Sequence, residues 1–139
     1  MLARTRTFAI QGVDAVAVDA EIDIHRGLPS FSLVGLPDAA VRESRERVRA
    51  AIVNSGFEFP LSRITANLAP ADLRKAGPGF DLAIAVAILC ASDQIPAAGL
   101  EDWWFAGELA LDGTVRGLSG VLAMAERAAR AREGEPSGV

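Results

Sequence analysis

A regular alternation of hydrophobic and polar residues indicates a long strand near the start of the chain. From Val16 to Ile24 every second residue is hydrophobic, and three of the residues between them are carboxylates. A period of two over this length is typical of a strand with one buried and one solvated face. Residues 5–10 are expected to form its partner strand, with a turn at Gln11-Gly12. The sequence therefore predicts an N-terminal β-hairpin.

Apolar residues at helical spacing follow. They predict three helices, at residues 38–55, 81–89 and 118–132. The first should begin near Pro37 or Asp38 and bury Val41, Val48 and Ile52. Its alternating arginines and glutamates between residues 42 and 49 favour a solvated outer face over a phosphate site. The second helix is apolar on nearly every side, which predicts a central position in the core.

Four shorter strands complete the predicted elements. They cover residues 31–34, 63–68, 103–109 and 111–115. The last two are separated by Asp112-Gly113, a pair typical of a two-residue hairpin turn. Strands and helices of this order are compatible with a mixed sheet packed against helices.

Composition limits the classes of function. Half of the 139 residues are hydrophobic and the net charge is −4, which argues against a dedicated nucleic-acid-binding module but leaves a local basic patch open. No apolar run is long enough to cross a bilayer, so we expect a cytoplasmic location and no membrane partner. The chain has one cysteine, Cys90, and one histidine, His25. A zinc site would have to draw its other ligands from carboxylates, so we expect no metal site.

The stretch from Lys75 to Leu89 is where a reactive site is expected first, because a glycine-rich turn leads into an apolar helix there. A P-loop would need a Gly-Lys dipeptide, which the sequence lacks, and Asp81 would oppose a bound anion. We interpret the Gly-Pro-Gly loop at residues 77–79 as a structural turn, with contact to an anion or DNA as the open alternative. No serine lies in a nucleophile-elbow context, so a triad with His25 is unsupported.

Four segments resemble the N-terminal domain of the ComM/YifB family. They are residues 31–52 (FSLVGLPDAAVRESRERVRAAI), 54–57, 63–75 (RITANLAPADLRK) and 80–85. Members of this family are magnesium-chelatase-like AAA+ ATPases linked to competence and DNA recombination. The resemblance covers essentially the whole chain and implies that residues 1–139 form one N-terminal domain of a longer protein.

A more distant resemblance is to the proteolytic domain of Lon and the C-terminal domain of RadA. Residues 107–121 are similar to the Lon segment that carries its catalytic lysine, and residues 77–79 to the Gly-Pro-Ser that carries its nucleophile. Matched residue by residue, the serine position falls on Gly79 and the lysine position on Leu122. Neither can attack a carbonyl or move a proton, so the resemblance implies a domain without peptidase activity.

The fold that the resemblance implies is α+β. It is a two-layer arrangement of a mixed sheet and helices, shared by Lon-type domains and a small-subunit ribosomal protein. In that family the last strand usually follows the final helix, so we expect this chain to stop before or within it. The P-loop ATPase module would lie downstream of residue 139.

For function, the resemblance implies a hexameric ring, driven by ATP, that acts as a helicase on branched DNA in recombination and natural transformation. ATP and Mg²⁺ would bind the downstream module, and this chain would hold no cofactor. The present domain would contribute DNA contacts, subunit contacts or both, with Arg74, Lys75 and Arg116 as DNA-binding candidates. Two alternatives stay open. One is a Lon-like serine hydrolase with a relocated pair, Ser119 and Lys75, and the other is a pure oligomerisation module.

Overall fold

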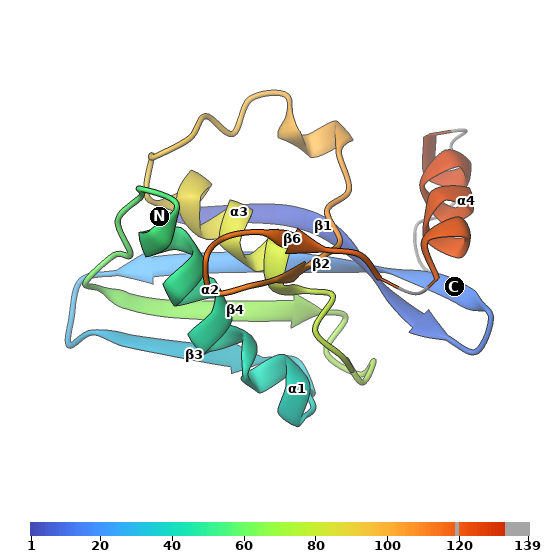
Figure 1. Ribbon diagram of the computed structural model, residues 1–139, viewed down its shortest axis with the longest axis horizontal. Helices are drawn as coiled ribbons and strands as arrows, with labels where there is room; N and C mark the ends of the chain where they lie inside the picture. Colours follow the sequence, from blue (N-terminus) through green and yellow to red (C-terminus); the bar gives the residue numbers. More distant parts are fainter. Residues whose placement is uncertain (119, 133–139) are drawn as a thin grey trace.

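A mixed four-stranded sheet forms the centre of the computed structural model, which describes residues 1–118 and 120–132 (Figure 1). Its strands are β1 (Leu2–Gln11), β2 (Asp14–His25), β3 (Ser30–Val34) and β4 (Arg63–Ala69), in the order β1-β2-β4-β3. β2 is antiparallel to both β1 and β4, whereas β3 is parallel to β4. The predicted hairpin and the α+β class are confirmed.

Helices and short elements connect and cover the strands. Between β3 and β4 lie α1 (Ala39–Arg42) and α2 (Ser44–Asn54), and α3 (Asp81–Ala91) follows β4. The rest of the described chain contains the 3₁₀ helix η1 (Leu100–Asp102), the hairpin β5 (Glu108–Leu109) and β6 (Val115–Arg116), and α4 (Val121–Arg132). Figure 1 shows α2 and α3 on the same face of the sheet.

The main core lies between that face and α3. Nine of the eleven residues of α3 are buried, and its many alanines let the helix approach the sheet closely. Val18 and Ile22 of β2 point toward α3 and are almost fully buried, whereas Asp19 on the opposite face is half-buried. The alternation in the sequence therefore identified the core face of β2 correctly.

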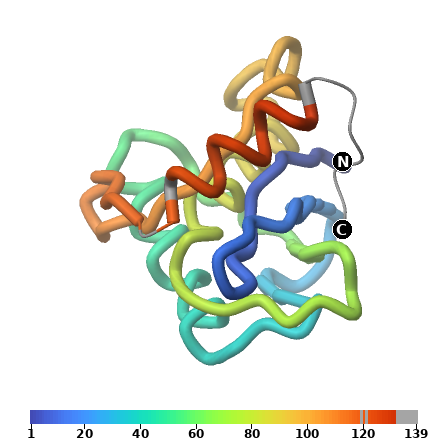
Figure 2. The backbone as a smooth tube through the Cα atoms, turned by 90° about the vertical axis from the view of Figure 1, so that its right-hand side faces the viewer, coloured from blue at the N-terminus to red at the C-terminus, as the bar shows by residue number. Residues whose placement is uncertain are grey.

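Helix α4 packs against the opposite face of the sheet, at the hairpin end of β1 and β2 (Figure 2). Thr5 of β1 donates to the carbonyl of Ala83 in α3, at 2.7 Å. Phe8 has the opposite parity in the strand, and it clusters with Ala15 and with Met124 of α4. Because neighbouring side chains of a strand point to opposite faces, α3 and α4 lie on different sides of the sheet.

The single helix predicted at residues 38–55 is wrong in one respect, because the structure divides it at Glu43 into α1 and α2. Asp38 caps α1 by accepting from the Val41 amide at 2.8 Å. The amide of Glu46 then donates to the carbonyl of Glu43 at 3.1 Å, a 3₁₀-type bond that interrupts the α-helical ladder.

The predicted strand at residues 103–109 is divided between two partners. The amide of Phe105 donates to the Arg6 carbonyl of β1 at 2.8 Å, whereas β5 pairs with β6. The β5–β6 loop spans residues 110–114, so the two-residue turn predicted at Asp112-Gly113 is wrong in size. Asp112 instead accepts from the Thr114 amide at 2.9 Å inside this longer loop. Within the described residues, no helix has the length and apolar character needed to cross a membrane.

Candidate functional site

The Gly-Pro-Gly loop at residues 77–79 forms one wall of a groove with a volume of about 510 Å³. Residues 8–10 of β1, together with Leu118 and Met124, also line the groove. Two backbone bonds hold the loop. The carbonyl of Gly79 accepts from the Gly107 amide at 3.1 Å, and the carbonyl of Pro78 accepts from the Asp81 amide at 3.3 Å. We call this feature the β1 groove.

Only one of the two positions matched to the Lon dyad lies in the β1 groove. Gly79 lines it, and a Cβ atom added there would lie 3.1 Å from Cδ1 of Leu118. Leu122, on α4, is 84% exposed and does not line the groove. Among the described groove-lining residues, Glu108 alone has an ionisable side chain, and its carboxylate lies 3.5 Å from Nη1 of Arg116.

Lys75 lies in the interior, although it was predicted to lie beside the loop as a DNA-binding candidate. Its side chain is fully buried, and its ammonium group donates to the carbonyl of Pro70. Its backbone joins the segment that precedes α1, accepting from the amide of Asp38 at 2.9 Å and donating to the carbonyl of Leu36 at 3.0 Å. Burial lowers the pKa of Lys75, and the charge of Asp72 partly opposes this shift. The ammonium group of Lys75 therefore does not reach the surface in this structure, and its contact with DNA stays a prediction.

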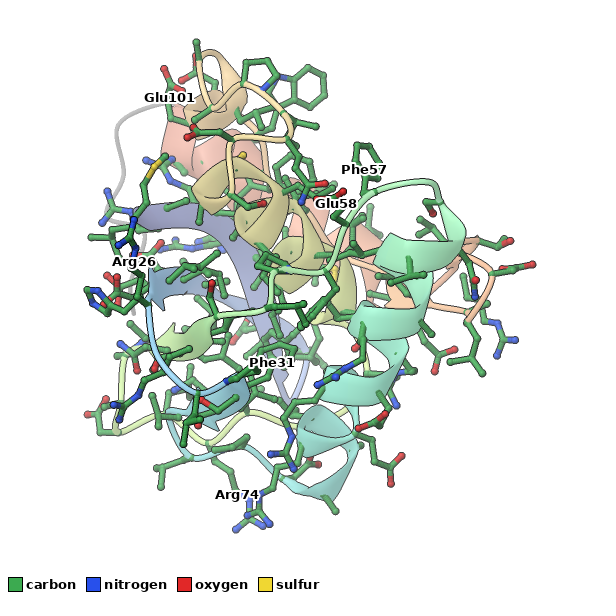
Figure 3. The ribbon with its side chains drawn as sticks, turned by 90° about the vertical axis from the view of Figure 1, so that its left-hand side faces the viewer. Arg26, Phe31, Phe57, Glu58, Arg74 and Glu101 are labelled. Carbon is green, nitrogen blue, oxygen red and sulfur yellow. The ribbon has the colours of Figure 1, made fainter. Side chains whose placement is uncertain are left out.

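The other two DNA-binding candidates are on the surface. Arg74 is exposed, and Figure 3 shows it projecting away from the molecule at a different place from Arg26. The side chain of Arg116 is 64% exposed and its charge is partly balanced by Glu108. Ser119, the proposed relocated nucleophile, lies outside the described residues, so its pairing with Lys75 stays a prediction.

A buried ion pair between α2 and α3 was missed at the level of sequence. Asp81 is fully buried, and Arg47 binds both of its carboxylate oxygens, with Nε to Oδ2 at 2.6 Å and Nη2 to Oδ1 at 3.1 Å. The Ser44 hydroxyl also donates to Oδ1, and the Leu109 amide donates to Oδ2 at 3.0 Å. The sequence had assigned Arg47 to a solvated face because arginines and glutamates alternate between residues 42 and 49.

This ion pair has the character of a structural contact. The hydrogen bonds to Asp81 raise the pKa of Arg47, in opposition to its burial. Each oxygen of Asp81 accepts two hydrogen bonds, so no free lone pair faces a substrate. Asp81 therefore joins α2, α3 and β5 and is not placed to act as a general base.

The single histidine and the single cysteine lie away from the β1 groove. His25 lies on the surface, with Nε2 2.7 Å from Oδ2 of Asp23 in the same strand. Cys90 is buried in α3, and burial raises the pKa of its thiol. Within residues 1–118 and 120–132, no three of the His, Cys, Asp and Glu side chains gather closely enough to hold a metal ion.

Comparison with known proteins places these features in a family. Residues 20–135 match the family model described as subunit ChlI of Mg-chelatase. The protein YifB of Salmonella typhimurium is 52% identical over 130 residues, which are 94% of this chain and 26% of that protein. Competence protein ComM of Haemophilus influenzae is 51% identical over 114 residues, which are 82% of this chain and 22% of that protein.

A relative from Mycobacterium tuberculosis is 49% identical over 121 residues, 87% of this chain and 24% of that protein. The chain thus spans about a quarter of the length of the curated relatives it matches. The family model covers most of the chain, and the identities are high along nearly all of it. The chain belongs to the ComM/YifB family of magnesium-chelatase-like proteins.

Proposed function

We propose that this chain is a non-catalytic N-terminal domain of a ComM-type AAA+ ATPase that acts as a helicase on branched DNA. In this proposal the domain contributes DNA contacts, subunit contacts or both. The helicase activity belongs to an ATPase module that binds ATP and Mg²⁺ elsewhere in a longer cytoplasmic protein. Family membership supports it, and the relative from Haemophilus influenzae is named a competence protein.

The observation that carries the non-catalytic part is the lining of the β1 groove. Gly79 supplies no hydroxyl at the position matched to the Lon nucleophile, and Leu122 supplies no amine at the position matched to the lysine. The only lysine of the chain, Lys75, is buried and bonded to a backbone carbonyl. An acyl transfer needs a nucleophile with a base in hydrogen-bond reach. The described part of the groove offers no such pair.

For DNA contact we propose Arg74 and Arg116, the two surface arginines among the original candidates. Each would neutralise a phosphate, and such contacts are sensitive to salt because they release condensed counterions. Arg74 is the stronger test, since Arg116 already lies near the carboxylate of Glu108. The acidic net charge of the chain restricts this contact to a small area.

The test uses the full-length protein and a branched DNA. Arg74→Glu should weaken binding. It should also make the fall of the logarithm of the binding constant with the logarithm of salt concentration less steep, by about one unit of slope. Arg26→Glu is the matched control, because it makes the same charge change at a different exposed position. If both variants bind with the affinity and salt dependence of the parent protein, Arg74 is not a DNA contact. A full-length protein lacking residues 1–139 should bind branched DNA more weakly, and unchanged binding would remove DNA contact from the proposal.

Subunit contact is the other role that we propose for the domain. Four large apolar side chains have exposed fractions between 84% and 89% and are candidates for such a contact: Val13, Leu28, Leu61 and Leu122. Sedimentation of the 139-residue chain and of the full-length protein tests this role. If the isolated chain is monomeric and deletion of residues 1–139 leaves ring assembly of the full-length protein unchanged, the domain does not contribute to the ring.

A further inference from the structure

An arginine of α2 reaches the outer edge of β3. This strand is the last in the order β1-β2-β4-β3, so among the described residues no strand pairs with that edge. The Ser30 amide donates to the Ser62 carbonyl, on the β4 side, at 3.2 Å. Because successive residues of a strand direct their backbone groups to opposite sides, the Phe31 carbonyl points to the outer edge. Arg45 meets it there, since its Nη1 donates to this carbonyl at 3.4 Å.

Two further arginines lie at the two ends of the same edge. Arg49 lines a small hollow together with Ser30, at the beginning of β3, and its guanidinium carbon lies 4.8 Å from the ring centroid of Phe59. Arg42 lies beyond the end of β3, where its Nη2 donates to the Pro37 carbonyl at 3.1 Å. The order of these contacts along the edge therefore follows α2 and α1 backward, from Arg49 to Arg42.

Arg74 extends this series of arginines. Pro37 forms a parallel bridge with Lys75, so the residue before Lys75 lies beside the same segment. Figure 3 shows the Arg74 side chain beside the ribbon of α1. All four arginines are exposed, and we call them the β3 arginine row: Arg42, Arg45, Arg49 and Arg74.

Positive charge exceeds negative charge along the β3 arginine row. Among the described residues, none of its four guanidinium groups forms an ion pair with a carboxylate. Arg47 turns inward to Asp81, and Glu43 pairs with Arg47 at 3.6 Å. Apart from Glu43, the exposed carboxylates nearest to the row along the chain are Glu46 and Asp72. The tertiary structure thus removes Arg47 from the alternating pattern and leaves the other arginines of α1 and α2 on the surface.

We propose that the β3 arginine row binds the phosphate backbone of one DNA strand that lies along the outer edge of β3. Guanidinium groups bind phosphate oxygens through charge-assisted hydrogen bonds. Arg45 and Arg49 are one helical turn apart, about 6 Å along the axis. This length is close to two phosphate steps of about 3.4 Å each along one strand of B-DNA. The inference rests on the DNA contact proposed above for Arg74 and extends it to α1 and α2.

The hydrogen bonds within the row hold the side chains at the edge. Arg45 donates to the carbonyls of Arg42 and Phe31, and Arg42 donates to the carbonyl of Pro37. A guanidinium group has five N–H donors, so these bonds leave most of the donors of both residues for phosphate oxygens. Contacts to phosphate position a protein on DNA but carry no sequence information. Binding through the row should therefore not depend on the base sequence.

The test measures binding of branched DNA by the full-length protein. The double variant Arg45→Gln/Arg49→Gln should bind at least tenfold more weakly at about 0.1 M salt, because two phosphate contacts are lost. The fall of the logarithm of the binding constant with the logarithm of salt concentration should become less steep by about two units of slope. Arg4→Gln/Arg6→Gln is the matched control, since it removes two exposed arginines from β1 at the opposite edge of the sheet. It should bind within threefold of the parent protein.

A second variant separates charge from effects on folding. Arg45→Lys/Arg49→Lys removes the same guanidinium groups but keeps both positive charges, so it should bind within threefold of the parent protein. Equal losses in the Gln and Lys variants would overturn the proposal, because charge would not be the cause. The loss in the Gln variant should be the same, within threefold, for two branched DNAs of different base sequence. A loss confined to one sequence would contradict a contact with the backbone.

Two more measurements keep this inference distinct from the function on which it rests. If deletion of residues 1–139 weakens DNA binding but Arg45→Gln/Arg49→Gln binds like the parent protein, the domain contacts DNA elsewhere and only the present inference fails. If the deletion leaves DNA binding unchanged, the proposed DNA contact fails and this inference fails with it. Sedimentation of the Gln variant should show an unchanged assembly state. Loss of assembly together with DNA binding would assign the row to a contact with another copy and overturn the proposal.

Discussion

Removal of Arg47 should destabilise the fold far more than removal of a neighbouring arginine. In Arg47→Met the fully buried carboxylate of Asp81 keeps the Ser44 hydroxyl and the Leu109 amide but loses both bonds from the guanidinium group. Loss of one partner from a buried ion pair costs about 3–5 kcal/mol. The Arg47 side chain is 19% exposed, so water can enter part of the vacated space. We expect a loss near the lower limit, about 3 kcal/mol.

Chemical and thermal unfolding measure this loss. With an m value of about 2 kcal/mol/M, the urea midpoint should fall by about 1.5 M. The melting temperature should fall by roughly 10 °C. Arg45→Met is the matched control, because Arg45 lies on the same helix, is exposed and bonds only to backbone carbonyls. It should change the free energy of unfolding by about 0.5 kcal/mol or less.

A double-mutant cycle with Asp81→Asn separates the ion pair from other effects of the substitution. Once the carboxylate is replaced by a neutral amide, loss of Arg47 should cost less, with a coupling of about 2 kcal/mol. Two results would refute this reasoning. One is an Arg47→Met variant as stable as Arg45→Met, and the other is a double variant whose loss equals the sum of the single losses.

Three further predictions concern single buried or constrained groups. The Thr7 hydroxyl is buried without a hydrogen-bond partner among the described residues, so Thr7→Val should raise the free energy of unfolding by about 1 kcal/mol. Thr5→Val should lower the free energy of unfolding by about 1 kcal/mol, because the Thr5 hydroxyl donates to the Ala83 carbonyl. Urea unfolding measures both changes, and equal changes in the two variants would contradict this prediction. Gly35→Ala should cost at least about 2 kcal/mol, since φ is +110° and the new Cβ would lie 2.2 Å from the Leu68 carbonyl oxygen. Gly12→Ala, with open space around it, should cost about 1 kcal/mol in the same unfolding assay. For Lys75 the lowered pKa means that the unfolded chain binds more protons than the folded chain between that lowered pKa and the ordinary value of 10.5. The contribution of Lys75 to stability should therefore increase as the pH rises through this interval. Urea unfolding between neutral pH and pH 10 should show this rise in the parent chain relative to Lys75→Met, and parallel pH profiles would exclude it.

Local patterns were sufficient for the elements that carry their own signal. The period of two in β2 identified its buried face, because Val18 and Ile22 alternate with carboxylates along one short segment. The apolar, alanine-rich composition of α3 identified it as the central helix. The family was also accessible from sequence, since long motifs around residues 31–75 carry it and the family model and relatives confirm it.

Groups whose role depends on a distant partner were assigned less well. Lys75 follows Arg74 in a polar loop and has no local feature that indicates burial, yet the approach of residues 36–38 encloses it. The strand predicted at residues 103–109 had two possible partners, and it divides between β1 and β6. Of the two positions matched to the Lon dyad, the structure places only Gly79 in the β1 groove.

The sequence by itself determined the N-terminal hairpin, the central helix, the α+β class and the family, because each depends on side-chain periodicity or on motifs within one segment. Tertiary structure alone decided that Arg47 binds Asp81, that Lys75 is buried and that exposed arginines follow the outer edge of β3. The physical reason is that charge pairing and burial depend on which segments meet in space. Arg47 and Asp81 are 34 residues apart, and no local pattern relates them.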